Sequence, residues 1–141
     1  EDVETHKGQI SFPGGMRGNN ESPEQTALRE TFEEIGIEAS RIRILGRFHD
    51  YLSSTDYLVS PFIGYVDEPF TLVPQVREVA EVLQVPFQVF RDTDRLRVER
   101  RIRHGREIEV YFYSYGHHEI WGLTAKIIKD FLAFLESDRR S

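Results

Sequence analysis

Residues 15–37 read GMRGNNESPEQTALRETFEEIGI, and they are the most informative stretch of the 141-residue sequence. Seven residues of this stretch follow the spacing Gly-x5-Glu-x7-Arg-Glu-x2-Glu-Glu-x-Gly: Gly15, Glu21, Arg29, Glu30, Glu33, Glu34 and Gly36. A helix repeats every ~3.6 residues, so Glu30, Glu33 and Glu34 are expected on one face, about one turn apart. Like charges at this spacing repel one another. The cluster therefore predicts a bound cation.

A Glu-Glu pair on a helix is, by itself, most often part of a solvated face. The seven-residue pattern is harder to attribute to chance, because residue frequencies near ~7% give a match on the order of 10⁻⁸ per starting position. Carboxylate oxygens suit Mg²⁺ or Mn²⁺, and such an ion can polarise a phosphoryl oxygen and activate water. Arg29 lies four residues before Glu33 and is expected to hold that carboxylate. The pattern therefore predicts metal-assisted hydrolysis of a phosphate bond.

The residues around the glutamates predict a loop followed by a helix. Residues 9–12 alternate as a short strand does, and Pro13-Gly14-Gly15 is expected to end it. Residues 22–25, Ser-Pro-Glu-Gln, predict a helix start in which Ser22 caps and Gln25 completes a capping box. Gly36 is expected to end the helix in a left-handed conformation. The inward face of the helix is expected to carry Ala27, Leu28, Thr31 and Ile35.

The remaining sequence is rich in predicted strands. Strands are expected at 42–45, 57–66, 79–85, 96–103 and 106–115, with Pro61 indicating an edge or a bulge. His104-Gly105 is a two-residue hairpin signal. A short helix is expected at 86–90 and a longer one at 124–135. The pattern predicts an α/β (α+β) layered domain with a mixed sheet and two principal helices.

Composition limits the classes of protein to which the chain can belong. Its 141 residues, 39% hydrophobic and 30% charged, predict one globular domain over residues 1–141. The absence of cysteine excludes disulfides and thiolate-bound metal sites, and is compatible with a cytoplasmic setting. A net charge of −6 without a basic patch argues against nucleic-acid binding. No apolar run approaches ~18 residues, so no membrane span is predicted.

The stretch from Gly15 to Ile37 resembles the Nudix box of the Nudix hydrolases, which cleave nucleoside diphosphates linked to another moiety. The resemblance implies an α/β/α sandwich and a loop-helix-loop site for Mg²⁺ or Mn²⁺. It also implies that Glu30, Glu33 and Glu34 are the metal ligands, with the carbonyl of Gly14 or Gly15 as a further candidate. The residues expected to take part in catalysis are Glu33, Glu34 and Arg29.

Two other positions of the box are informative. Glu21 matches the early acidic position of the family, for which the resemblance implies an auxiliary role. Thr31 departs from the pattern, because the family usually has an aliphatic residue there. Thr is isosteric with Val and is also β-branched, so we expect mild destabilisation with the chemistry retained.

Three further segments resemble the coenzyme A pyrophosphatase branch of the family, at residues 8–15, 78–86 and 120–125. The implied reaction is hydrolysis of coenzyme A to 3′,5′-ADP and 4′-phosphopantetheine. Phe12, Gly14 and Gly15 are the residues expected to contact this substrate. The branch also has an upstream strand and a basic residue four positions before Gly8. This sequence has Glu4 at that position, and it begins at Glu1 rather than Met, which leaves room for a missing first strand and for a homodimer.

Several alternatives stay open at the level of sequence. The enzyme could act on ADP-ribose, a dinucleotide or a nucleoside triphosphate, or the domain could bind a nucleotide without cleaving it. Glu78 and Glu81 are either a metal ligand or base from outside the box, or charges at a strand edge. Trp121 is expected in the core, and no role is assigned to His117-His118. Arg97, Arg100, Arg101 and Arg103 could meet substrate phosphates, but a solvated, partly ion-paired face is expected for them.

Overall fold

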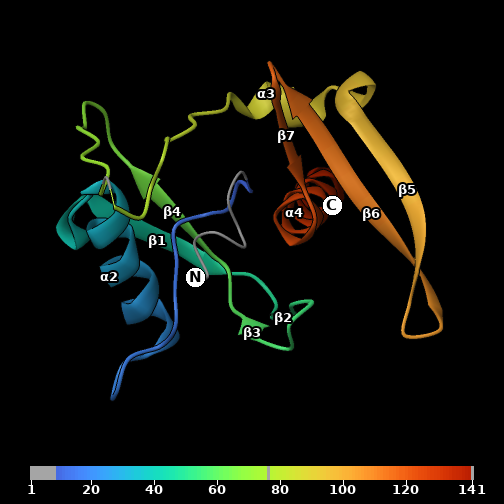
Figure 1. Ribbon diagram of the computed structural model, residues 1–141. Helices are drawn as coiled ribbons and strands as arrows, with labels where there is room; N and C mark the ends of the chain where they lie inside the picture. Colours follow the sequence, from blue (N-terminus) through green and yellow to red (C-terminus); the bar gives the residue numbers. More distant parts are fainter. Residues whose placement is uncertain (1–8, 76, 141) are drawn as a thin grey trace. The chain divides into compact units, whose positions relative to one another are not determined.

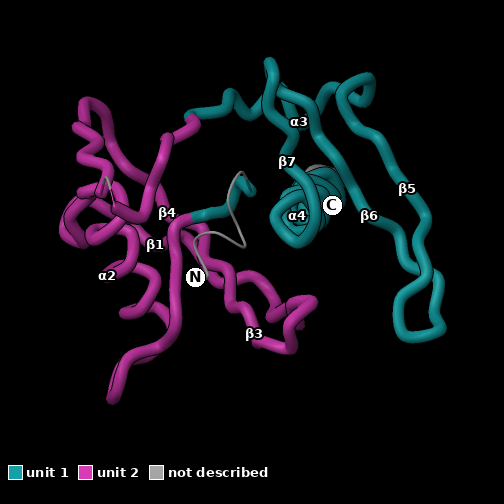
Figure 2. Tube along the Cα trace, in the orientation of Figure 1, with its two compact units in different colours: residues 1–12, 84–141 teal, residues 13–83 magenta. Residues whose placement is uncertain are grey.

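The computed structural model describes residues 9–75 and 77–140. The chain divides into two compact units (Figure 2). Unit 1 comprises residues 1–12 and 84–141, and unit 2 comprises residues 13–83. The predicted polar stretch before Gln9, including Glu4, lies outside the described residues.

Unit 2 contains a long helix and two pairs of strands (Figure 1). Its elements in chain order are α2 (Pro23–Ile35), η1 (Ala39–Arg41), β1 (Ile42–Arg47), β2 (Tyr51–Leu52), β3 (Leu58–Val59) and β4 (Phe62–Val66). β1 pairs with β4 and β2 pairs with β3, both antiparallel. The register of β1 on β4 shifts between Ile44 and Gly46, which is the signature of a β-bulge.

Unit 1 is a three-stranded antiparallel sheet packed against the last helix (Figure 1). Its elements are α3 (Phe87–Arg91), η2 (Thr93–Arg95), β5 (Leu96–Arg103), β6 (Arg106–Tyr115), β7 (His118–Trp121) and α4 (Leu123–Arg140). His104 and Gly105 both have positive φ, 52° and 74°, as a type I′ turn between β5 and β6 requires. Tyr113, Ile120 and Ala125 are almost fully buried and form the centre of the core.

The predicted fold class and its two principal helices are confirmed, as α2 and α4. The strands at β1, β5 and β6, the His104-Gly105 turn and the short helix α3 also lie where the sequence predicted them. β7 was not predicted, because it is only 4 residues long. None of the helices in the described part of the chain combines the length and the apolar character needed to cross a membrane.

Three details of the predicted strands were wrong. Residues 9–12 and 79–85 form no strand, because a β-prone sequence becomes a strand only where a partner completes its ladder. The predicted strand at 57–66 is divided into β3 and β4 at Ser60 and Pro61, since proline donates no ladder hydrogen bond. Every strand pair in the described residues is antiparallel, so these residues show small antiparallel sheets where one mixed sheet was predicted.

Candidate active site

The helix that carries the glutamates begins and ends as its sequence predicts. Ser22 Oγ accepts from the Gln25 amide at 3.1 Å, and Gln25 Oε1 accepts from the Ser22 amide at 2.9 Å, which completes the capping box. Pro23 occupies the first turn. Gly36 ends the helix in the left-handed region with φ 80°, and its amide donates to Phe32 O at 2.9 Å. Both ends of α2 are therefore set by local hydrogen bonds.

Glu30 and Glu34 form a carboxylate pair beside the Pro-Gly-Gly loop. Burial, followed by the hydrogen bond to Glu30, raises the pKa of Glu34 to about 7. The Gly14 amide donates to Glu34 Oε1 at 3.4 Å. A Cβ built on Gly15 would lie 2.5 Å from Glu30 Oε2 and 2.8 Å from Glu30 Oε1. The absence of a side chain at Gly15 therefore allows the loop to lie directly against the Glu30 carboxylate.

Glu33 lies apart from this pair and contacts Arg29. Arg29 Nη1 donates to Glu33 Oε1 at 3.2 Å, as the i, i+4 spacing predicted, and also to Glu30 Oε2 at 3.0 Å. The side chain of Glu33 is 52% exposed, whereas that of Glu30 is 17% exposed. Arg29 therefore joins Glu33 to the carboxylate pair through its guanidinium group.

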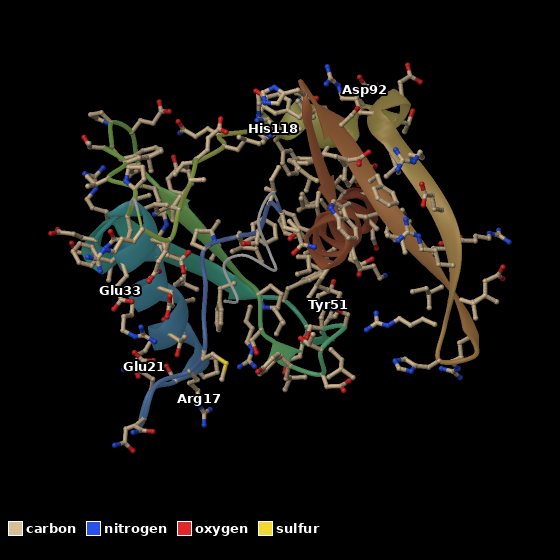
Figure 3. The ribbon with its side chains drawn as sticks, in the orientation of Figure 1. Arg17, Glu21, Glu33, Tyr51, Asp92 and His118 are labelled. Carbon is tan, nitrogen blue, oxygen red and sulfur yellow. The ribbon has the colours of Figure 1, made fainter. Side chains whose placement is uncertain are left out.

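Glu21 holds the other side of the Arg29 guanidinium. Arg29 Nε donates to Glu21 Oε2 at 2.6 Å, and Arg29 Nη2 donates to Glu21 Oε1 at 3.1 Å. Glu21 Oε1 also accepts from the Gly18 amide and from Thr26 Oγ1, each at 2.8 Å. The hydrogen bond from Arg29, with those from Thr26 and Gly18, lowers the pKa of Glu21 to about 2. Figure 3 shows Glu21 near the N-terminal end of α2 and Glu33 further along the helix.

Thr26 was not identified from the sequence as part of this network. A threonine inside a helix usually bonds to its own backbone, and its hydroxyl carries no recognisable motif. Its position five residues after Glu21 and three before Arg29 could have indicated the contact, but only once Glu21 was known to turn back onto the helix.

The segment after β4 brings a further acid toward the pair. The amides of Val73 and Gln75 donate to Ile35 O at 2.8 Å and to Glu34 O at 2.9 Å, so this segment lies against the end of α2. The chain then turns, and the negative charge of Glu78 contributes to the raised pKa of Glu34. Of the two acids considered from outside the glutamate stretch, Glu78 is thus linked electrostatically to the carboxylate pair.

The donor set fits a divalent cation. Glu30, Glu34 and the backbone carbonyls of Gly14 and Gly15 are hard oxygen donors, and two carboxylates held together favour a cation between them. Among the side chains that the structure describes, no group of three or more acidic or histidine residues is arranged to hold a metal ion. The position of Glu33 on Arg29 is consistent with this finding. The assignments of Glu30, Glu33 and Glu34 as metal ligands stay predictions.

Three other residues considered from sequence lie in unit 1. Phe12 is 49% exposed, and its contact with substrate stays a prediction. Arg97 pairs with Glu99 at 2.9 Å and with Glu119 at 2.8 Å, and the exposed, ion-paired face predicted for this residue is confirmed. Trp121 is half-buried and stacks on Phe112, with ring centroids 5.7 Å apart.

Comparison with known proteins agrees with the geometry of the site. The family model described as NUDIX domain matches residues 2–104. An uncharacterized Nudix hydrolase NudL of Photorhabdus laumondii is 37% identical over 127 residues, which cover 89% of this chain and 68% of that protein. Proteins of the same name in Yersinia pestis and Yersinia pseudotuberculosis are 36% identical over 125 residues, covering 88% of this chain and 63% of theirs. The chain thus spans less than two thirds of the length of the two Yersinia relatives.

Proposed function

Because the chain belongs to the Nudix family, whose hydrolases generally use divalent ions such as Mg²⁺ or Mn²⁺, we propose that it hydrolyses the pyrophosphate bond of coenzyme A or its thioesters. The observation that carries the reaction type is the Glu30–Glu34 pair lying against Gly14 and Gly15. The choice of substrate is supported by the three flanking segments at 8–15, 78–86 and 120–125. We propose that residues 1–141 contribute to one catalytic domain.

Each residue of the site has a proposed role in this reaction. Glu30, Glu33 and Glu34 hold the ion with a carbonyl of the Gly14-Gly15 turn, and Arg29 positions the carboxylates. The ion, when bound, neutralises charge on the phosphate oxygens and lowers the pKa of water. Phe12, Gly14 and Gly15 contact the substrate. The acids supply charge, and Gly15 leaves room for the Glu30 carboxylate beside the loop.

The reaction consumes one water molecule. The water oxygen bonds to one phosphorus of the pyrophosphate, and the bond from that phosphorus to the bridging oxygen breaks. A carboxylate of the site takes the proton from the water. The products are 3′,5′-ADP and 4′-phosphopantetheine, or the acylated phosphopantetheine when the substrate is a thioester.

A substrate panel tests the proposal. The purified chain is incubated with Mg²⁺ or Mn²⁺ and with coenzyme A, an acyl-coenzyme A, ADP-ribose, a dinucleotide or a nucleoside triphosphate, and the products are identified by mass. We expect 3′,5′-ADP from coenzyme A. Turnover of ADP-ribose or a dinucleotide alone would assign the chain to another Nudix pyrophosphatase class. Nucleotide binding without turnover of any compound would indicate a sensor.

Substitution of Glu34 tests the site itself. Glu34→Gln removes the charge while keeping the shape, and we expect a loss of at least ~10²-fold in turnover with the fold intact. Glu24→Gln is the matched control, because Glu24 lies in the first turn of the same helix and its side chain is exposed. Unchanged turnover in Glu34→Gln would exclude Glu34 as a ligand.

A further inference from the structure

We propose that Thr26 is a positioning residue for the metal-binding carboxylates and acts on them through Glu21 and Arg29. The inference rests on the proposed function, since it assigns Thr26 to the same site. Thr26 is 5% exposed and is the one buried polar residue in the described part of the chain. A buried hydroxyl needs a hydrogen-bond partner, so the partner that it selects indicates its role.

The hydroxyl of Thr26 has two acceptors within reach. It lies 2.8 Å from Glu21 Oε1 and 3.2 Å from Ser22 O. A hydroxyl has a single hydrogen to donate, and a bond to an ionised carboxylate is shorter and stronger than one to a neutral carbonyl. The hydrogen of Thr26 is therefore directed at Glu21. The hydroxyl thus holds the Glu21 side chain and not the backbone carbonyl of Ser22.

Glu21 in turn fixes the orientation of the Arg29 guanidinium. The five N–H groups of Arg29 are all used: Nε and one Nη2 hydrogen on Glu21, the other Nη2 hydrogen on Met16 O at 3.2 Å, and the two Nη1 hydrogens on Glu30 and Glu33. The group is planar, so the fork held by Glu21 determines where Nη1 lies. The position of Glu21 therefore determines where Arg29 Nη1 meets the carboxylates of Glu30 and Glu33.

Loss of the Thr26 hydroxyl would loosen this chain of contacts at its start. Glu21 Oε1 would keep the Gly18 amide and Arg29 Nη2, but these donors come from a loop and from the group that Glu21 must position. Thr26 ties the carboxylate to α2 independently of Arg29, the group that the carboxylate positions. Mutation of a residue that hydrogen-bonds to a metal ligand typically lowers metal affinity or activity by about 10–100-fold. Because Thr26 acts through two residues, we expect an effect near the lower limit.

Thr31 provides a matched control on the same helix. Its hydroxyl donates to Ala27 O at 2.7 Å, and it is half-buried. Thr31→Val therefore removes a threonine hydroxyl from α2 without touching the Glu21–Arg29 network. Thr26→Val makes the same chemical change inside the network, and Thr26→Ser restores the hydroxyl without the methyl group.

The experiment measures the Mn²⁺ dissociation constant of the four proteins, by titration calorimetry at a temperature where all are folded, together with kcat/KM on coenzyme A. We expect Thr26→Val to weaken Mn²⁺ binding about 10-fold, Thr26→Ser to recover most of it, and Thr31→Val to match wild type. If Thr26→Val cannot be isolated folded, Thr26→Ala removes the same hydroxyl and carries the same prediction.

Three outcomes would overturn the proposal. Wild-type Mn²⁺ affinity in Thr26→Val would do so, as would a loss of thermal stability with unchanged affinity, which indicates a role in the helix alone. Equal impairment of Thr26→Ser and Thr26→Val would assign the effect to packing of the methyl group. The Mn²⁺ titration needs no turnover, so a chain that fails to cleave coenzyme A still decides the role of Thr26.

Discussion

Adding one methyl group at Gly15 should impair the site more than the same change at Gly14. The Cβ of an alanine at position 15 would lie 2.5 Å from Glu30 Oε2, while ordinary contacts begin near 3.4 Å. A Cβ at position 14 would meet no atom within 4 Å. Neither glycine is among those with positive φ, so alanine brings no backbone strain of that kind at either position.

The magnitude follows from how far Glu30 must move. To restore an ordinary contact the carboxylate must withdraw by about 1 Å, and a misplacement of that size at a reacting centre can cost on the order of 10²-fold in rate. We therefore expect kcat/KM to fall about 100-fold in Gly15→Ala, and to fall less in Gly14→Ala, whose Cβ meets no atom of the protein within 4 Å.

The assay compares the two variants with wild type under identical Mg²⁺ concentrations, with the substrate identified by the panel. Both variants keep the main-chain carbonyls of residues 14 and 15, so a difference between them reports on space and not on the loss of a carbonyl ligand. Far-ultraviolet circular dichroism checks that both are folded. Equal activity in Gly15→Ala and Gly14→Ala would refute the inference that the loop must lie against the Glu30 carboxylate.

Two further predictions concern Glu21, which holds Arg29, and Arg41, which holds the segment after β4. The pKa of Glu21, lowered from 4.5 to about 2 by Arg29, contributes stability that is present above pH 4.5 and is lost as the pH falls from about 4.5 to about 2. Urea unfolding across that range should show a shallower loss in Glu21→Gln than in wild type, and parallel curves would contradict the assignment. Arg41 Nη2 donates to Asp67 O at 2.8 Å and to Pro69 O at 2.7 Å, so Arg41→Gln should release the segment that follows. The amides of Val73 and Gln75 should then exchange their hydrogens about 5- to 10-fold faster, as expected for the loss of bonds worth ~1 kcal/mol, and unchanged exchange would exclude this role.

The features that the sequence predicted correctly depend on neighbours within a few residues. The capping box at Ser22 and Gln25, the left-handed Gly36 and the His104-Gly105 turn each involve contacts within about one turn of chain. Residues 79–85 have the composition of a strand, yet they form none, because pairing depends on a partner that local sequence does not specify. Element type was therefore predictable where the hydrogen bonds are local.

The contacts of the site also separate into local ones, which the sequence predicts, and distant ones, which it does not. The Arg29–Glu33 contact was predictable from the i, i+4 spacing, and it was found. The contacts of Thr26 and Glu78 depend on how the loop before α2 and the segment after β4 fold back onto the helix. When two side chains meet only because a loop folds back onto a helix, their spacing in the sequence does not predict the contact.

Glu30, Glu33 and Glu34 were expected on one face of the helix, but helix geometry explains why Glu33 contacts Arg29 instead. Successive residues are about 100° apart around a helix, so Glu30 and Glu34 differ by about 40°, as do Arg29 and Glu33. These are two i, i+4 pairs offset by one residue. One pair joins opposite charges and closes as a salt bridge, and the other brings two carboxylates together. Arg29 also donates to Glu30, which links the two pairs. The same helix thus carries a repulsive pair suited to a cation and, beside it, the arginine that keeps one member of that pair in place.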